Sequence, residues 1–242
     1  MHVSPIMAAV FDDVLITTRS NKYKRLATLV VGKGEDIFQV PAVMLSTISP
    51  FFKAALSGDW KEASEDKVEL PEESPLIFGI FLEWLFRRHM GSTGWEGYLI
   101  GDHDTHLVEL YIFADHTQIV ELKNAIITNF HSRPKDLWRL PISTLQMVFD
   151  ETPEKCTLQQ LIIAAWLEIP AHKVSLLGDV VDSVPSMAKI LIMAFGRRSD
   201  ESEERYLCDA VGEYLEGKGA KESDPPQSVP QKKRKKWMRP YA

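Results

Sequence analysis

Histidine and aspartate side chains are concentrated in one short stretch of the chain. The run Asp102–His106 carries two histidines and two aspartates, and Asp115 and His116 follow further along. Imidazole and carboxylate groups are the ligands that zinc and non-haem iron accept. A metal-dependent enzyme built on His103, His106 and His116 is therefore one hypothesis.

The spacing of these residues favours a structural explanation. An HxxH pair is a weaker metal signature than HExxH, which places two histidines one helical turn apart. Asp104 or Thr105 before an apolar helix is an ordinary helix cap, and an acid in the first turn suits the helix dipole. We predict that this run begins a helix and that the chain needs no metal or other cofactor.

The common sequence motifs of catalysis are not found in the chain. It has no GxSxG and no phosphate-binding GxxxxGK[ST]. The stretch Gly32–Gly34 lacks the remaining glycine and the hydroxyl residue of such a loop, and hairpin turns use the same residue types. We predict a protein that is not an enzyme and takes no small-molecule substrate.

Cysteine usage and hydropathy indicate the compartment. Cys156 and Cys208 lie far apart without a CxxC or CxxH context, which fits a reducing environment. There is no apolar run of the roughly 18 to 20 residues that a membrane span needs, and no signal peptide at the N-terminus. We expect no membrane partner and a location in the nucleus, the cytoplasm or both.

The charge is unevenly distributed along the 242 residues. The whole chain has a formal charge of −6, but six of its 28 basic residues lie in the last twelve positions. Residues 1–230 then hold 22 basic against 34 acidic side chains, a charge of −12. An acidic body lacks the clustered cations that nucleic-acid binding requires, so we expect nucleic-acid contact only nonspecifically, through the tail.

The elements that must position these residues follow from apolar spacing and turn residues. Residues 1–24 are predicted to form a loosely ordered arm. A hairpin over 27–31 and 36–40 follows, then a short helix with Val43, Met44, Leu45 and Ile48 on its apolar side. Ser49 is predicted to cap a second helix that starts at Pro50. The next elements are a strand over 67–70 and a helix over 76–88 with a buried stripe of Phe78, Phe81, Leu82, Leu85 and Phe86.

Helices dominate the rest of the chain. Two are expected between 104 and 130. Four more are expected within a C-terminal region of residues 141–216, over 142–149, 157–167, 185–195 and 201–215. Residues 217–242 have a composition typical of disorder and carry the basic cluster. The predicted class is α+β, a small mainly three-stranded sheet flanked by helices, followed by an all-α extension.

This order of elements resembles the BTB/POZ family, and in particular the short BTB proteins of filamentous fungi. The resemblance covers about residues 25–133 and rests on several motifs in the expected order: Thr28–Gly32 (TLVVG), Phe38–Val40 (FQV), Leu45, Ser49–Leu56 (SPFFKAAL), Trp60–Ala63 (WKEA), Val68–Pro71 (VELP) and the Phe81–Phe86 helix.

The resemblance implies a protein-protein interaction module that forms a homodimer through its N-terminal segment and first helices. Many members bridge a cullin-type ubiquitin ligase scaffold to a substrate, and those members carry a hydrophobic-x-Glu signature after the SPFF-type helix. Trp60, Lys61 and Glu62 match it here, and with Phe52 they form the predicted partner-binding set. An alternative is that Trp60 packs over its own helix end and Glu62 is solvated.

The C-terminal tail supports a second interpretation. The basic cluster Lys232, Lys233, Arg234, Lys235 and Lys236 is typical of a nuclear-import signal. The chain is then a nuclear regulator associated with transcription or chromatin, in which the BTB region supplies dimerisation and the tail supplies import or nonspecific nucleic-acid contact.

Overall fold

The apolar runs near the start of the chain form a small mixed sheet. In the computed structural model, which describes residues 23–34, 36–57, 66–91, 103–170, 174–196 and 211–217, the strands are β1 (Leu26–Val31), β2 (Asp36–Pro41) and β3 (Lys67–Leu70). Their order is β2-β1-β3, with β2 antiparallel and β3 parallel to β1. The predicted hairpin and third strand are present with bounds within one residue.

Gly32 closes the hairpin in a conformation that requires glycine. Its φ is +75°, and a Cβ atom at this position would lie 3.0 Å from Pro75 Cγ. Its N–H also donates to the Leu70 carbonyl oxygen at 3.0 Å. The turn therefore packs against the start of the helix that begins at Pro75 and against the end of β3.

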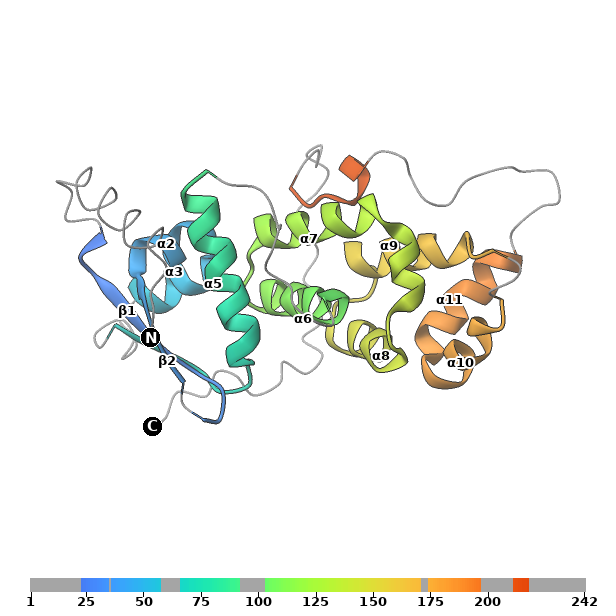
Figure 1. Ribbon diagram of the computed structural model, residues 1–242, viewed down its shortest axis with the longest axis horizontal. Coiled ribbons are helices and arrows are strands. Elements are labelled where there is room, and N and C mark those ends of the chain that lie inside the picture. Colours follow the sequence, from blue (N-terminus) through green and yellow to red (C-terminus); the bar gives the residue numbers. More distant parts are fainter. Residues whose placement is uncertain are drawn as a thin grey trace, which may run out of the picture.

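Helices make up most of the structure, and they follow one another along its long axis (Figure 1). Their bounds are α2 (Ala42–Ile48), α3 (Pro50–Ser57), α5 (Pro75–His89), α6 (His103–His116), α7 (Val120–Ser132), α8 (Ile142–Glu151), α9 (Thr157–Leu167), α10 (Leu176–Ser183) and α11 (Pro185–Gly196), with 3-10 turns η2 (Pro134–Arg139) and η4 (Val211–Tyr214). The sheet with α2, α3 and α5 occupies one end, α6 and α7 the middle, and α8 to α11 the other end.

Two of the helix predictions need correction, and two observed elements lie where none was predicted. The helix α10 and the turn η2 were not predicted. The helix expected over 201–215 falls mostly outside the described residues, and its last part, Val211–Tyr214, is a 3-10 turn. Helix α6 begins at His103, so Asp104 lies inside the first turn instead of capping it.

The predicted stripe of α5 is confirmed in part, since Phe78, Phe81 and Leu85 are buried and Leu82 and Phe86 are only half-buried. Phe78 and Phe81 are fully buried, and their rings lie 5.5 Å apart. Phe78 contacts Phe38 of β2 at 4.9 Å, and Phe81 contacts Phe113 of α6 at 5.0 Å between ring centroids. One helix face thus joins the sheet to the helices behind it.

The core continues from the sheet into the C-terminal helices. Buried apolar residues from Ala27 in β1 to Tyr214 in η4 belong to one connected cluster. Helices α6 and α7 make the connection, since α6 packs on α5 and α8, and α7 packs on α9. None of the described helices is long and apolar enough to cross a membrane.

Candidate protein-interaction surface

Arg25, just before β1, holds both ends of the segment that joins α3 to β3. Its Nη2 group donates to the Leu56 carbonyl oxygen at 2.7 Å, and its Nε group donates to Asp66 Oδ1 at 2.7 Å. The hydrogen bond with Asp66 raises the pKa of Arg25 above its ordinary value, so the guanidinium stays charged. One side chain therefore fixes the two positions between which residues 58–65 must run.

Asp66 is itself fixed to the sheet. Its φ of +50° lies in the left-handed region, which aspartate tolerates better than most residues. Its carbonyl oxygen accepts the Thr28 N–H of β1 at 2.7 Å. The C-terminal anchor of the segment thus has a backbone bond to β1 as well as the Arg25 ion pair.

The predicted partner-binding residues are only partly within the described chain. Trp60, Lys61 and Glu62 lie outside the described residues, as do Lys232, Lys233, Arg234, Lys235 and Lys236. Phe52 is described and has no exposed surface; its ring lies 5.2 Å from Phe51 and 6.4 Å from Phe81. This burial makes Phe52 a core residue that supports the helix, and not a residue that touches a partner directly.

Ser49 caps α3, as predicted, and also links α3 to the middle of the molecule. Its Oγ accepts the Phe52 N–H at 3.1 Å and donates to the Thr117 carbonyl oxygen at 2.5 Å. The residue is almost fully buried. The Ser-Pro pair in the sequence predicts the cap, but the hydrogen bond from Ser49 to Thr117 in the α6–α7 turn depends on tertiary packing.

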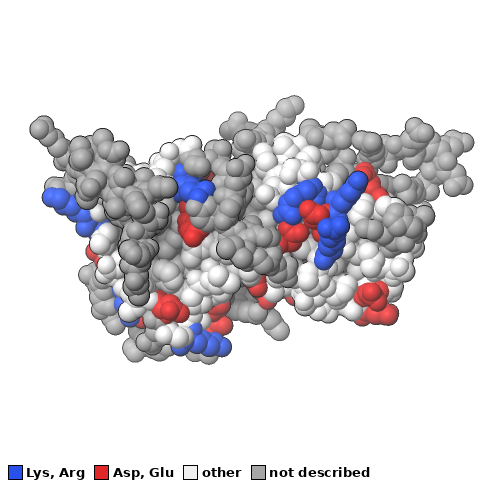
Figure 2. Space-filling model, viewed as in Figure 1, with Lys and Arg blue, Asp and Glu red and all other residues white. Residues whose placement is uncertain are grey.

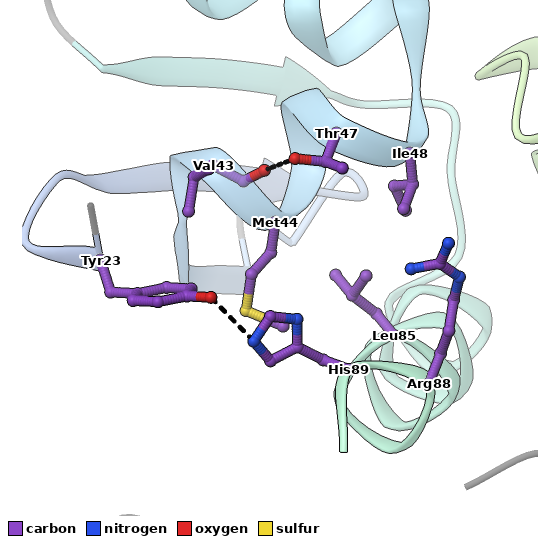
Figure 3. A pocket seen from close by; sticks show the side chains of 8 residues that line it. All are labelled: Tyr23, Val43, Met44, Thr47, Ile48, Leu85, Arg88 and His89. Carbon is purple, nitrogen blue, oxygen red and sulfur yellow. Dashed lines mark hydrogen bonds between the residues drawn. The ribbon is translucent and has the colours of Figure 1, made fainter. Parts of the chain in front are cut away.

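A small pocket lies between α2 and the C-terminal end of α5 (Figure 3). The Tyr23 hydroxyl and His89 Nε2 are hydrogen-bonded at 3.0 Å across one side of it. Met44 and Leu85 provide apolar surface from the two helices, and Arg88 lies at the opposite side from Tyr23. The full lining is Tyr23, Val43, Met44, Thr47, Ile48, Leu85, Arg88 and His89.

The fold of the N-terminal half and the comparison with known families lead to the same assignment. Residues 20–130 match the family model of the BTB/POZ domain. This region is a BTB/POZ domain. Its small mixed sheet flanked by helices is the predicted α+β fold, and such domains are protein-protein interaction modules. The resemblance to fungal short BTB proteins stays a prediction.

Three charged or titratable side chains of α6, those of Asp104, Asp115 and His116, take part in structural contacts. His116 Nδ1 lies 3.6 Å from Glu73 Oε1, and that interaction raises the pKa of His116. Asp115 pairs with Lys123 and Asp104 with Arg133. Among the described side chains, which do not include that of His103, no three His, Cys, Asp or Glu groups are placed to hold a metal ion.

The charges on the described surface are mixed. On the face in Figure 2, basic and acidic side chains form small separate groups instead of one extended basic area. A polyanion needs clustered cations for tight binding. The side chains visible on this face therefore provide no such surface.

Sequence analysis missed Arg25 and Tyr23. Tyr23 lies in the predicted N-terminal arm, and Arg25 follows that arm directly before β1. Their partners Leu56, Asp66 and His89 are 31, 41 and 66 positions away, so no local pattern indicates the contacts.

Proposed function

We propose that this BTB/POZ protein is a non-enzymatic homodimeric adaptor that presents Trp60, Lys61 and Glu62 to a cullin-type ubiquitin ligase scaffold. The observation that supports the proposal most is the Arg25 contact pair. Because Arg25 ties Leu56 to Asp66, the segment that carries these residues starts and ends at fixed points of the domain.

Fixed ends favour binding for an entropic reason. A partner must immobilise the segment on binding, and the cost is smaller when its ends are already held. An aromatic anchor beside a carboxylate is also a typical binding hot spot, with the tryptophan in a pocket and the charge at the rim.

The test is a pull-down of the full chain with a cullin N-terminal domain. Trp60→Ala and Glu62→Lys should each weaken capture, and Arg25→Ala should weaken it less because it acts through position. Glu69→Lys is the matched control, since Glu69 is an exposed glutamate on β3. Equal capture of wild type, Trp60→Ala and Glu62→Lys would remove the assigned role of this segment.

Dimerisation is assigned in this proposal to the N-terminal segment and α2. In support, the pocket of Figure 3 lies where that segment joins the domain, and Val43 and Ile48 of α2 are half-buried beside it. Charge at this surface should oppose association. We expect Val43→Glu to lower the solution mass of the full chain from dimer to monomer in light scattering, and a wild-type monomer would contradict the proposal.

The basic cluster Lys232–Lys236 supports a second proposal, import into the nucleus. Deleting residues 231–242 should shift a fluorescent fusion from the nucleus to the cytoplasm. A strictly cytoplasmic wild type would overturn it, and with it the role as a nuclear regulator.

A further inference from the structure

The segment Val211–Gly217 lies on the surface of α7 and α9, in the middle of the molecule. It consists of η4 and the three residues that follow, and it contacts both helices (Figure 1). We call the surface beneath it the α7/α9 groove, formed by Lys123, Asn124 and His131 of α7 together with α9. The groove is separate from the segment held by Arg25.

Asn124 recognises the backbone of the segment. Its Nδ2 donates to the Glu216 carbonyl oxygen at 2.9 Å, and its Oδ1 accepts the Glu216 N–H at 2.8 Å. One side-chain amide thus satisfies both backbone groups of a single residue, as a neighbouring strand would. This contact fits a peptide chain of any sequence.

Lys123 recognises a carboxylate. Its side chain is only 9% exposed, and its Nζ lies 2.7 Å from Glu216 Oε2 and 2.8 Å from Asp115 Oδ1. Burial lowers the pKa of Lys123, but the hydrogen bonds to the two carboxylates outweigh it, so the pKa lies above its ordinary value. The buried ammonium therefore selects a negatively charged residue at the position of Glu216.

An aromatic side chain provides the third contact. Tyr214 is 7% exposed, and its ring centroid lies 5.7 Å from that of His131. Val211 and Leu215 are partly buried beside it. The groove thus receives an aromatic residue two positions before an acidic one, with a backbone contact at the acidic residue.

We propose that the α7/α9 groove is a docking site for a linear segment of a partner protein with the pattern aromatic-x-Glu, and that Val211–Gly217 occupies it in cis. The occupant is held by one aromatic side chain, one carboxylate and one backbone pair, all of which a short peptide carries by itself. The covalently attached segment acts as a competitor at high effective concentration, so a partner must displace it.

The test measures binding of a labelled peptide with the sequence of residues 211–217 to full-length protein by fluorescence anisotropy. The double variant Tyr214→Ala, Glu216→Gln weakens the binding of the cis segment to the groove and leaves the residues of the groove unchanged. Its affinity for the peptide should exceed that of wild type by about tenfold or more, since a millimolar internal competitor is removed. A peptide with the same two substitutions should not bind.

Two further variants of the protein test whether the peptide binds at the α7/α9 groove. Glu121→Gln alters a glutamate of α7 that pairs with Arg88 outside the groove, and it should behave as wild type. Asn124→Ala, added to the double variant, should remove at least about nine-tenths of the peptide affinity, because it deletes both backbone hydrogen bonds. Unchanged binding after Asn124→Ala would overturn the proposal.

Hydrogen exchange shows independently whether the cis segment is released. Amides of 211–217 should exchange faster in the double variant, and if they do while the peptide still fails to bind, the groove is not a docking site. If the double variant melts below the assay temperature, the single variant Glu216→Gln replaces it. It should give a smaller rise in peptide affinity and in the exchange rate of amides 211–217, and no rise in either quantity overturns the proposal. If the wild-type protein is a dimer and the peptide dissociates it, the groove binds a second copy of the chain and not a partner protein.

Discussion

The helices α9 and α11 have similar apolar sequences but very different surroundings. In α9, TLQQLIIAAWL, the residues from Leu161 to Leu167 are all buried. In α11, PSMAKILIMAFG, Met187 and Leu191 are buried, whereas Ile192 is 62% and Met193 is 50% exposed. Composition alone does not distinguish these two helices.

The difference arises from their neighbours. Helix α9 lies among η2, α7, α8, α11 and η4, whereas α11 packs on α9 and α10 at the end of the molecule. A helix that is surrounded buries all of its faces, and a terminal helix buries one. The comparison teaches that apolar content indicates how much a helix can bury, and its place in the fold determines how much it does.

The largest effect should come from truncating equivalent apolar side chains in the two helices. Leu161 of α9 is fully buried, so Leu161→Ala should lower the free energy of unfolding by about 3 kcal/mol through lost burial and a cavity. Ile192→Ala should change it by less than about 0.5 kcal/mol because the side chain is mostly exposed. Urea unfolding followed by circular dichroism measures both, and equal losses would contradict the comparison.

A smaller effect should show whether hydrogen bonds also hold α9 in place. Trp166 Nε1 donates to the Leu137 carbonyl oxygen at 3.3 Å, and the side chain is 2% exposed. Trp166→Phe should lower the free energy of unfolding by about 2 kcal/mol, because it removes buried volume and leaves the Leu137 carbonyl group unpaired. Trp138→Phe is the matched control: it loses a bond to Ala165 at 2.9 Å from a less buried ring and should cost about 1 kcal/mol. The reverse order, by the same unfolding assay, would disprove this account.

A pH series should separate apolar from electrostatic stabilisation. The folded pKa of His116 is raised by Glu73, so the stability from this pair is present below about pH 6.5 and is lost as pH rises through the raised pKa. Glu73→Gln should therefore lower the free energy of unfolding by more near pH 5.5 than near pH 8.5. The difference between the two pH values should be less than about 1 kcal/mol because the pair is partly exposed. The Leu161→Ala loss should be the same at both pH values, and a pH-dependent loss there would argue against purely apolar burial.

The smallest change in stability is expected on the open face of α11. Ile192→Lys should alter the free energy of unfolding by less than about 0.5 kcal/mol and should reduce binding of a hydrophobic dye. Lys189→Met, an opposite change at another exposed position of α11, should increase dye binding. If Ile192→Lys costs more than about 1 kcal/mol, this face is covered in solution.

Local signals in the sequence predicted most elements of the BTB/POZ domain. The Ser49 cap, the stripe through Phe78 and Phe81, and the strand over 67–70 follow from residue types within a few positions of one another. Helix α10 was missed although Leu176, Leu177 and Val180 have helical spacing, because Gly178 and two aspartates interrupt a segment of only eight residues. Phe52 was assigned to a partner surface because of its motif, whereas its complete burial against Phe81 makes it a core residue.

The sequence by itself determined the order of the elements, the buried face of α5 and the separation of an acidic body from a basic tail, since these depend on local spacing and composition. Only the tertiary structure decided that β3 runs parallel to β1, that Arg25 joins Leu56 to Asp66, and that Asn124 holds Glu216 from 92 positions away. The physical reason is that hydrogen bonds and burial act over a few ångströms in space. Their partners are brought together by packing that no local pattern encodes.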